Sequence, residues 1–228
     1  MYLPSLRTVF IHAQKTGGTA ISWAFIRSGL TEATIVDQKM PGKEEFTFEI
    51  LENSSSGKHT TLRGYKRAIP TAAIEWALVV WRHPADRLVS RYLYSLRARG
   101  VNDSSFRPGY REFMRTIRET RSIIQSLALE SVDPHLTYFV VDFEHIEGGL
   151  MAFFEKFDGV DAELVLANFQ RINKNPWGLS IRRSWRGKAL LMVSRILVSI
   201  THHRKDLRIR PKGPFLELSG EELFGRSK

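Results

Sequence analysis

Apolar residues in the first part of the chain form short runs of strand length, and helical spacing follows each run. Thr8 to His12 (TVFIH) is β-branched and aromatic and predicts a strand, whereas Thr19 to Ser28 carries apolar residues at helical intervals. Ala77 to Trp81 (ALVVW) is a continuous apolar run, typical of a strand covered on both faces in a parallel sheet. We therefore expect strand-loop-helix units and a buried central strand.

The segment after this central strand predicts an amphipathic helix. Pro84 suits the first helical turn, and apolar residues then recur on one face. The expected apolar stripe consists of Leu88, Val89, Tyr92, Leu93 and Leu96, with Arg87, Arg91 and Arg97 outside it.

The later pattern continues the alternation of elements. Phe113 to Leu129 predicts an amphipathic helix, Leu136 to Phe143 a strand, and Leu150 to Phe157 a helix. Alternating strands and helices indicate an α/β sandwich. The polar stretch Asp37 to Lys58, with its Ser-Ser-Ser-Gly cluster, predicts an irregular excursion suited to a substrate loop.

No Pro/Ser-rich linker divides the chain, so we expect a single domain over residues 1–228. Residues 178–228 form a basic C-terminal segment that contains the apolar run Ala189 to Ile200, and its pattern assigns no element with certainty.

Composition adds a strong positive charge. The formal net charge is +10, a field that attracts phosphates, sulfates, acidic polysaccharides, nucleic acid and anionic membrane surfaces. The chain has no cysteine, which excludes disulfides and thiolate metal sites. Met1 to Arg7 lacks the features of a signal peptide, and no stretch reaches the roughly 18 apolar residues of a membrane span, so we expect a cytoplasmic location.

The loop between the first strand and the first helix, HAQKTGGT at 12–19, has the composition of an anion cradle. Backbone N–H groups and the positive end of the helix can surround a phosphate there. The candidate ligands are Lys15 for its charge, Gly17 and Gly18 for close approach, and Thr16 and Thr19 for their hydroxyl groups. A glycine-rich turn with a solvated lysine is the structural alternative.

The order of residues distinguishes this loop from the phosphate loop of nucleoside triphosphatases. That loop reads G-x-x-x-x-G-K-[ST], with lysine after the glycines, whereas Lys15 precedes Gly17 and Gly18. The order therefore argues against an ATP-dependent kinase, which stays an alternative function.

The second strand-to-helix junction carries candidates for a separate phosphate. Arg82 follows the predicted central strand, at the edge where ligands bind in open α/β sheets. Its planar guanidinium suits a phosphate, and the Ser90 hydroxyl lies about two helical turns further on. An arginine at a strand end and a serine packed in a helix are the structural alternative.

Together these residues resemble a known family. KTGGT after a strand ending in His is similar to the 5'-phosphosulfate loop of sulfotransferases that use 3'-phosphoadenosine 5'-phosphosulfate (PAPS), above all their Golgi carbohydrate branch and its bacterial relatives. Arg82 to Ser90 resembles the 3'-phosphate motif R-x-P-x-x-R-x-x-S and implies that both residues bind the 3'-phosphate. His83 departs from the pattern, which has Asp or Asn there, so we expect altered loop hydrogen bonding.

The resemblance runs from about Thr8 to about Trp177. It implies a P-loop-like central parallel sheet flanked by helices, PAPS as co-substrate without a metal, and a hydroxyl acceptor, namely a saccharide or polysaccharide. Its weaker matches are the basic-His segment Lys58 to Thr61, the strand-ending Asp142 to Glu144 and the loop Asn173 to Trp177. Arg210 to Gly213 is similar to a basic element that contacts the 3'-phosphate in cytosolic sulfotransferases, although a solvated turn is the favoured explanation.

The chemistry assigns two catalytic candidates. Sulfuryl transfer needs charge stabilisation on the transferred group and the departing phosphate, which Lys15 can supply; plain phosphate binding is its alternative role. The acceptor hydroxyl benefits from a base, and histidine can serve because it titrates near neutral pH. His59 is the first candidate because it follows the polar loop and because the resembling carbohydrate enzymes carry a candidate base in this stretch; a solvated loop histidine is the structural alternative. Glu144 and His12 are the other candidates for this base.

A non-enzymatic polyanion-binding module is the remaining alternative. Its basis is a basic ridge at helical spacing. A solvated helix face is the simpler explanation of this ridge, and a third explanation is that it guides an acidic polysaccharide toward the site. No nucleic-acid-binding motif accompanies the ridge, so no nucleic-acid partner is expected, while peripheral contact with a membrane stays open. The ridge comprises Arg107, Arg111, Arg115, Arg118 and Arg121.

Overall fold

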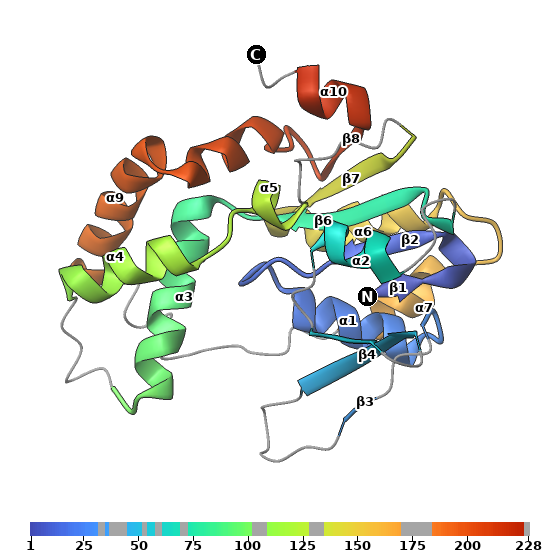
Figure 1. Ribbon diagram of the computed structural model, residues 1–228, viewed down its shortest axis with the longest axis horizontal. Coiled ribbons are helices and arrows are strands. Elements are labelled where there is room, and N and C mark those ends of the chain that lie inside the picture. Colours follow the sequence, from blue (N-terminus) through green and yellow to red (C-terminus); the bar gives the residue numbers. More distant parts are fainter. Residues whose placement is uncertain are drawn as a thin grey trace.

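The computed structural model describes residues 1–31, 35–36, 45–51, 54–57, 61–68, 73–101, 109–127, 135–169 and 184–225. These residues form an α/β fold around a five-stranded sheet in the order β1-β2-β6-β7-β8, with helices on both of its faces (Figure 1). The strands of this sheet are β1 (Tyr2–Leu3), β2 (Thr8–Ile11), β6 (Trp76–Trp81), β7 (Thr137–Asp142) and β8 (Phe215–Ser219).

The sheet is mixed, which corrects the expected parallel sheet. β2, β6 and β7 are parallel, with β6 at the centre as expected, whereas β1 and β8 are antiparallel edge strands. β1 reaches β2 through the short 3-10 turn η1 (Pro4–Leu6) and Arg7 at φ 47°. Such a short connection can only join antiparallel neighbours, because a parallel pair needs a crossover of a dozen or more residues.

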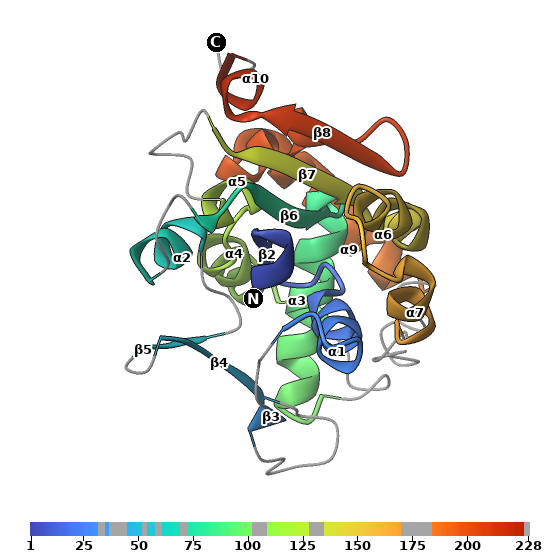
Figure 2. The same cartoon turned by 90° about the vertical axis from the view of Figure 1, so that its right-hand side faces the viewer.

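Helices cover the two faces of the sheet, and each face has its own apolar core (Figure 2). α1 (Gly18–Arg27), α6 (Ile146–Phe154) and α7 (Ala162–Ala167) pack on the face that bears Phe10 and Phe139. The opposite face, which bears Val9 and Val79, is covered by α2 (Leu62–Ala68) and α5 (Ile123–Ser126). Neighbouring residues of one strand thus enter different cores, as the period of two requires.

A third apolar cluster joins three helices beside the sheet. α3 (Pro84–Ala98) packs between α4 (Tyr110–Glu119) and α9 (Trp185–Ile200), and the predicted apolar stripe of α3 is buried there. Arg87, expected outside that stripe, is instead fully buried. A buried ion pair with Asp206, described below, is the physical reason.

The predicted helix 113–129 is divided in two. α4 ends at Glu119, and Ser122 starts α5 with a capping box in which its hydroxyl accepts from Gln125 N while the Gln125 side chain accepts from Ser122 N. This reciprocal bonding satisfies the first donors of a new helix, so α4 does not continue. The predicted helix 150–157 also begins earlier, at Ile146.

The polar excursion expected at 37–58 contains strands, so that expectation was wrong for the described part. β3 (Ile35–Val36), β4 (Glu45–Leu51) and β5 (Ser54–Gly57) pair antiparallel in a second sheet. The sequence of β4, EFTFEIL, alternates polar and apolar residues, which is the pattern of a strand with one buried face.

The C-terminal segment also joins the main body. After α9 come the 3-10 segment η4 (His202–Ile209), strand β8 beside β7, and α10 (Gly220–Gly225). Among the described residues, no helix is both long and apolar enough to cross a membrane.

Candidate functional site

The carboxyl ends of the three parallel strands meet at one edge of the sheet. Ile11 ends β2, Trp81 ends β6 and Asp142 ends β7, and Trp81 is the register partner of Asp142. Ligands of open α/β sheets bind outside this edge. Both predicted phosphate junctions therefore start from it.

The first loop has the backbone of a close-approach turn. Lys15 and Gly17 have left-handed φ values of 64° and 81°, and Gly17 is the N-cap of α1. Gly18 packs on the buried ring of His12, where a Cβ atom would lie 2.1 Å from His12 Cδ2. The glycines are thus required by local geometry, and they leave the first N–H groups of α1 facing the loop without a capping side chain.

The two threonines of the loop differ in their surroundings. Thr16 is buried, and its Oγ1 donates a 2.8 Å hydrogen bond to Ala13 O, so this hydroxyl shapes the loop. In this arrangement the Thr16 hydroxyl proton is directed to Ala13 O, so the expected role of this hydroxyl as a phosphate donor stays a prediction. Thr19, in the first turn of α1, is partly exposed.

Arg82 connects the two junctions directly. Its Nη1 donates a 3.0 Å hydrogen bond to Lys15 O, and its guanidinium lies 4.3 Å from the ring centroid of Phe143, the residue after β7. A Cβ atom on Gly17 would lie 3.2 Å from Phe143 Cε2. The residues that follow β2, β6 and β7 are therefore in mutual contact.

One face of α3 is turned toward the first loop. Arg87 Nε donates to Gln14 O at 3.2 Å, and Lys15 Nζ lies 4.3 Å above the ring centroid of Tyr94. Ser90 stands three residues after Arg87 and four before Tyr94, so it shares their helix face. This arrangement places Ser90, itself partly exposed, on the side of α3 that faces Lys15.

Sequence reasoning gave no site role to three residues of this arrangement, namely Arg87, Tyr94 and Phe143. A signal existed for the two on α3, because both stand at helical spacing from Ser90. Phe143 could not be found in this way, since its contact depends on how β6 and β7 pair.

Arg87 and Asp206 form a buried ion pair behind the loop. Arg87 Nη1 lies 2.8 Å from Asp206 Oδ2, and Nη2 donates to Arg121 O at 2.8 Å. Asp206 also accepts from Ile123 N and Ile124 N at 2.9 and 3.0 Å. Burial raises the pKa of Asp206 and lowers that of Arg87, while their mutual attraction opposes both shifts.

This ion pair ties three parts of the chain together. Through Arg87 it connects the phosphate-loop candidate at Gln14 with α5 and with the C-terminal segment η4. The position of the first loop therefore depends on residues far along the chain.

His83, which stands where the resembling motif has Asp or Asn, caps the start of α3. It is the N-cap of α3, where its Nδ1 accepts a 3.2 Å hydrogen bond from Ala85 N. Burial lowers the pKa of His83; Asp86 opposes this shift, and Arg195 and Arg210 add to it, so the neutral ring can accept this bond.

Arg210 also belongs to this neighbourhood. Its Cζ atom lies 5.6 Å from the ring centroid of Trp81, the last residue of β6. The C-terminal basic element, for which a solvated turn was the favoured explanation, therefore brings a cation beside Trp81, the last residue before Arg82, while Lys212 is exposed.

The candidates for the general base differ in whether the structure describes them and in how exposed they are. His59, with the segment Lys58 to Thr60, and the loop Asn173 to Trp177 lie outside the described residues. Glu144 is exposed after β7, and its backbone N–H donates to Asp142 Oδ1 at 3.1 Å. His12 is buried against Gly18, as expected of a core histidine.

The basic ridge is exposed where it is described, since Arg111, Arg115, Arg118 and Arg121 all face solvent; Arg107 lies outside the described residues. Within the described ranges, no group of three or more His, Cys, Asp or Glu side chains is placed to hold a metal ion.

Comparisons with known proteins do not add to this geometry: no family model, no curated protein and no solved structure matches the chain.

Proposed function

We propose that this chain is a PAPS-dependent sulfotransferase with a P-loop-like sulfotransferase fold. The observation that carries the proposal is the hydrogen bond from Arg82 to Lys15 O, because it joins the two motif loops at the carboxyl edge of the parallel strands. One nucleotide with two separate phosphate groups would use both loops at once.

In this proposal the 5'-phosphosulfate lies against residues 15–19. Lys15 supplies a positive charge, and the backbone N–H groups of Gly17, Gly18 and Thr19 supply donors at the start of α1. Arg82 and Ser90 bind the 3'-phosphate with a guanidinium fork and a hydroxyl group. Arg210 adds positive charge beside this second site.

The transfer step needs in-line geometry and stabilisation of charge. The acceptor oxygen forms a bond to sulfur while the bond from sulfur to the 5'-phosphate oxygen breaks, so 3'-phosphoadenosine 5'-phosphate leaves. Lys15 stabilises the negative charge that develops on the leaving phosphate. The hydroxyl proton passes to a base, for which His59 is the first candidate and Glu144 the second.

The acceptor in this proposal is a saccharide or polysaccharide, as in the family that the motifs resemble. The exposed arginines of α4 would attract an acidic polysaccharide. The cytoplasmic location expected from the sequence is retained as part of the proposal.

Calorimetry with two nucleotides tests the proposal against the kinase alternative. We expect 3'-phosphoadenosine 5'-phosphate to bind in the presence of EDTA, and to bind at least about tenfold more tightly than ATP with Mg²⁺. Only the first ligand offers a 3'-phosphate to Arg82 and Ser90. Tighter binding of ATP with Mg²⁺, or no binding of the 3'-phosphorylated nucleotide, would reject the sulfotransferase assignment.

A transfer assay adds the reaction itself. Incubation with PAPS and a panel of saccharides, read by the mass of a sulfate ester on the product, should give transfer that EDTA does not abolish. Transfer that stops in EDTA and returns only with Mg²⁺ would contradict the assignment of charge stabilisation to Lys15.

A further inference from the structure

α9 has an apolar face that the fold does not bury. Trp185, Met192, Ile196 and Ile200 are 74%, 63%, 58% and 73% exposed, respectively. The opposite face of α9 packs on α3 through Leu190 and Val198, which are buried in the same cluster as the α3 stripe. α9 is therefore apolar on two sides, and within the described ranges only the side that faces α3 is buried.

The exposed apolar residues form a continuous stripe. At the 100° per residue of an α-helix, Trp185, Met192, Ile196 and Ile200 fall within about 80° of the helix circumference. A solvated helix normally carries polar residues on such a face, so a stripe of this length indicates an interaction surface.

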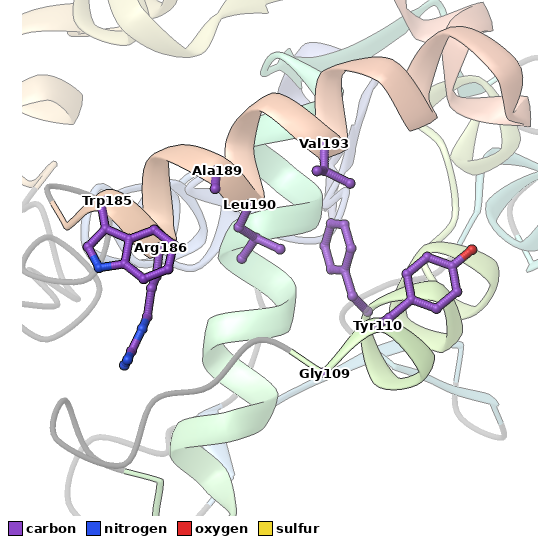
Figure 3. A pocket seen from close by; sticks show the side chains of 8 residues that line it. Gly109, Tyr110, Trp185, Arg186, Ala189, Leu190 and Val193 are labelled. Atoms are coloured by element: carbon purple, nitrogen blue, oxygen red, sulfur yellow. The ribbon is translucent and has the colours of Figure 1, made fainter.

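The stripe continues into a pocket between α4 and α9 (Figure 3). The pocket has a volume of about 360 Å³, and its apolar lining includes Tyr110 and Phe113 of α4 and Ala189 and Val193 of α9. Tyr110 is itself exposed. The apolar surface therefore extends from α9 across the pocket to α4.

Positive charges flank the stripe on both sides. The helical period places Arg186, which also lines the pocket and lies 5.5 Å from the Trp185 ring centroid, at one border of the stripe and Lys188 with Arg195 at the other. η4, which follows α9, adds the exposed cations Arg204, Lys205 and Arg208.

In the described segment from α9 through η4, no acidic side chain is exposed. Asp206 is the only acidic residue between 185 and 212, and it is buried in its ion pair with Arg87. On neighbouring α4, Glu112 contacts Arg99 and Glu119 lies near Arg115.

We propose that the exposed face of α9 is a peripheral binding surface for an anionic lipid bilayer. An apolar stripe with basic residues along both borders matches a helix that lies in the plane of the membrane interface. The apolar side chains would enter the boundary of headgroups and acyl chains, and the cations would meet the anionic headgroups.

The charge pattern also favours a membrane over a second copy of the chain. A symmetric dimer through α9 would place the same patch on both subunits and bring its cations face to face. Like charges across an interface oppose association, whereas an anionic bilayer complements them. This inference rests on α9 and η4 and does not depend on sulfuryl transfer.

Vesicle co-sedimentation tests the proposal directly. We expect the protein to bind phosphatidylcholine vesicles that contain phosphatidylglycerol, and to bind vesicles of phosphatidylcholine alone at least about tenfold more weakly. Raised salt should weaken the binding, because it screens the headgroup charge. Equal binding to both kinds of vesicle, or to neither, would overturn the proposal.

A matched pair of variants locates the surface. Ile196→Glu should lower the affinity for phosphatidylglycerol vesicles at least about tenfold, because it puts a carboxylate in the stripe. Leu164→Glu makes a comparable change at a residue that is 49% exposed on α7, away from α9 in Figure 1, and should leave binding unchanged. Equal losses in both variants would exclude α9 as the binding surface.

Two further measurements distinguish binding of a membrane by α9 from binding of a second copy of the chain. Brominated acyl chains should quench tryptophan fluorescence, and Trp185→Phe should remove most of that quenching. In sedimentation velocity without lipid, the parent should not form a dimer that Ile196→Glu dissociates. Such a dimer would show that a second copy covers α9, and unchanged quenching in Trp185→Phe would show that α9 does not enter the bilayer; either result would overturn the proposal.

Discussion

Arg82 donates a 3.0 Å hydrogen bond from Nη1 to the backbone oxygen of Lys15. The residue after the central strand thus holds the loop after the first strand, at a position where Lys15 has a left-handed backbone with φ 64°. Two segments 67 residues apart in the sequence form one structural unit through this bond. A substitution at either residue should therefore alter phosphate binding at both proposed sites.

The contact between Gly18 and His12 predicts that Gly18→Ala destabilises the protein. The added Cβ would overlap the buried His12 ring, so the ring or the start of α1 must move. We expect a loss of about 1–3 kcal/mol in the free energy of unfolding, measured with urea, and weaker binding of 3'-phosphoadenosine 5'-phosphate. Gly213→Ala is the control, because a Cβ there meets no atom within 4 Å. Equal stability of the two variants would show that the contact is not tight.

The buried pair of Arg87 and Asp206 predicts a much larger effect than an exposed pair. Arg87→Met leaves the Asp206 carboxylate buried without its cation and should cost about 3–5 kcal/mol of unfolding free energy. Arg7→Met removes the partner of Glu75 in a pair that is half exposed, and should cost at most about 1 kcal/mol. Chemical denaturation of both variants checks the difference. Similar losses of unfolding free energy would contradict the structural role given to the buried pair of Arg87 and Asp206.

His203 predicts a pH dependence of stability with a definite sign. Burial lowers its pKa from 6.5 to about 4, so between these values the unfolded chain binds a proton that the folded protein does not. The free energy of unfolding should therefore fall as the pH falls through this window, by about 3 kcal/mol. Below the folded pKa the effect is complete.

Two histidine variants test this assignment. His203→Gln should flatten the decline in stability between pH 6.5 and about 4, whereas His202→Gln should keep it. Thermal or urea unfolding over this pH range gives the comparison. An unchanged slope in His203→Gln would assign the decline to other groups.

Much of the fold was predictable because its main signals are local. The apolar run at 77–81 indicated the central strand, and the pattern after Pro84 indicated α3; both are confirmed. The edge strand β8 was not predictable, because Phe215 to Ser219 becomes a strand only by pairing with β7. Arg87 was misplaced for a related reason: an arginine is expected outside an apolar stripe unless a distant acid such as Asp206 compensates its charge.

The candidate site also combines residues that a local pattern indicates with contacts that depend on strand pairing. Composition and spacing singled out Lys15, Gly17, Gly18 and Arg82 as candidates, because a loop between a strand and a helix is a local pattern. The contacts of Arg82 with Lys15 O and Phe143 depend on the pairing of β2, β6 and β7, which no single segment encodes.

The proposed general base predicts a separation of chemistry from binding. His59→Ala should lower the rate of sulfate transfer by about 10²-fold to 10⁴-fold, because the acceptor proton loses its base. The affinity for the donor should stay nearly constant, since His59 is assigned to the acceptor and not to the nucleotide. A folded His59→Ala protein that transfers sulfate at the parent rate would move the role to Glu144 or His12.

In the proposed function, Arg82 and Ser90 bind a 3'-phosphate while residues 15–19 bind the 5' end of the same nucleotide. Because Arg82 also holds Lys15, replacing Arg82 weakens the binding of any nucleotide that contacts this loop. The decisive quantity is therefore the ratio of the affinities for a ligand with a 3'-phosphate and a ligand without one. Ser90→Ala provides a second variant that leaves the hydrogen bond between Arg82 and Lys15 in place.

The most direct measurement is calorimetric binding of 3'-phosphoadenosine 5'-phosphate and of adenosine 5'-phosphate to the parent, Arg82→Ala and Ser90→Ala proteins. A charge-assisted hydrogen bond contributes about 1.5–3 kcal/mol, so Arg82→Ala should weaken the 3'-phosphorylated ligand at least about tenfold more than its dephosphorylated analogue. Ser90→Ala should also weaken binding of the 3'-phosphorylated ligand more than binding of its dephosphorylated analogue, but by a smaller factor. Equal losses for the two ligands in both variants would contradict the assignment of the 3'-phosphate site.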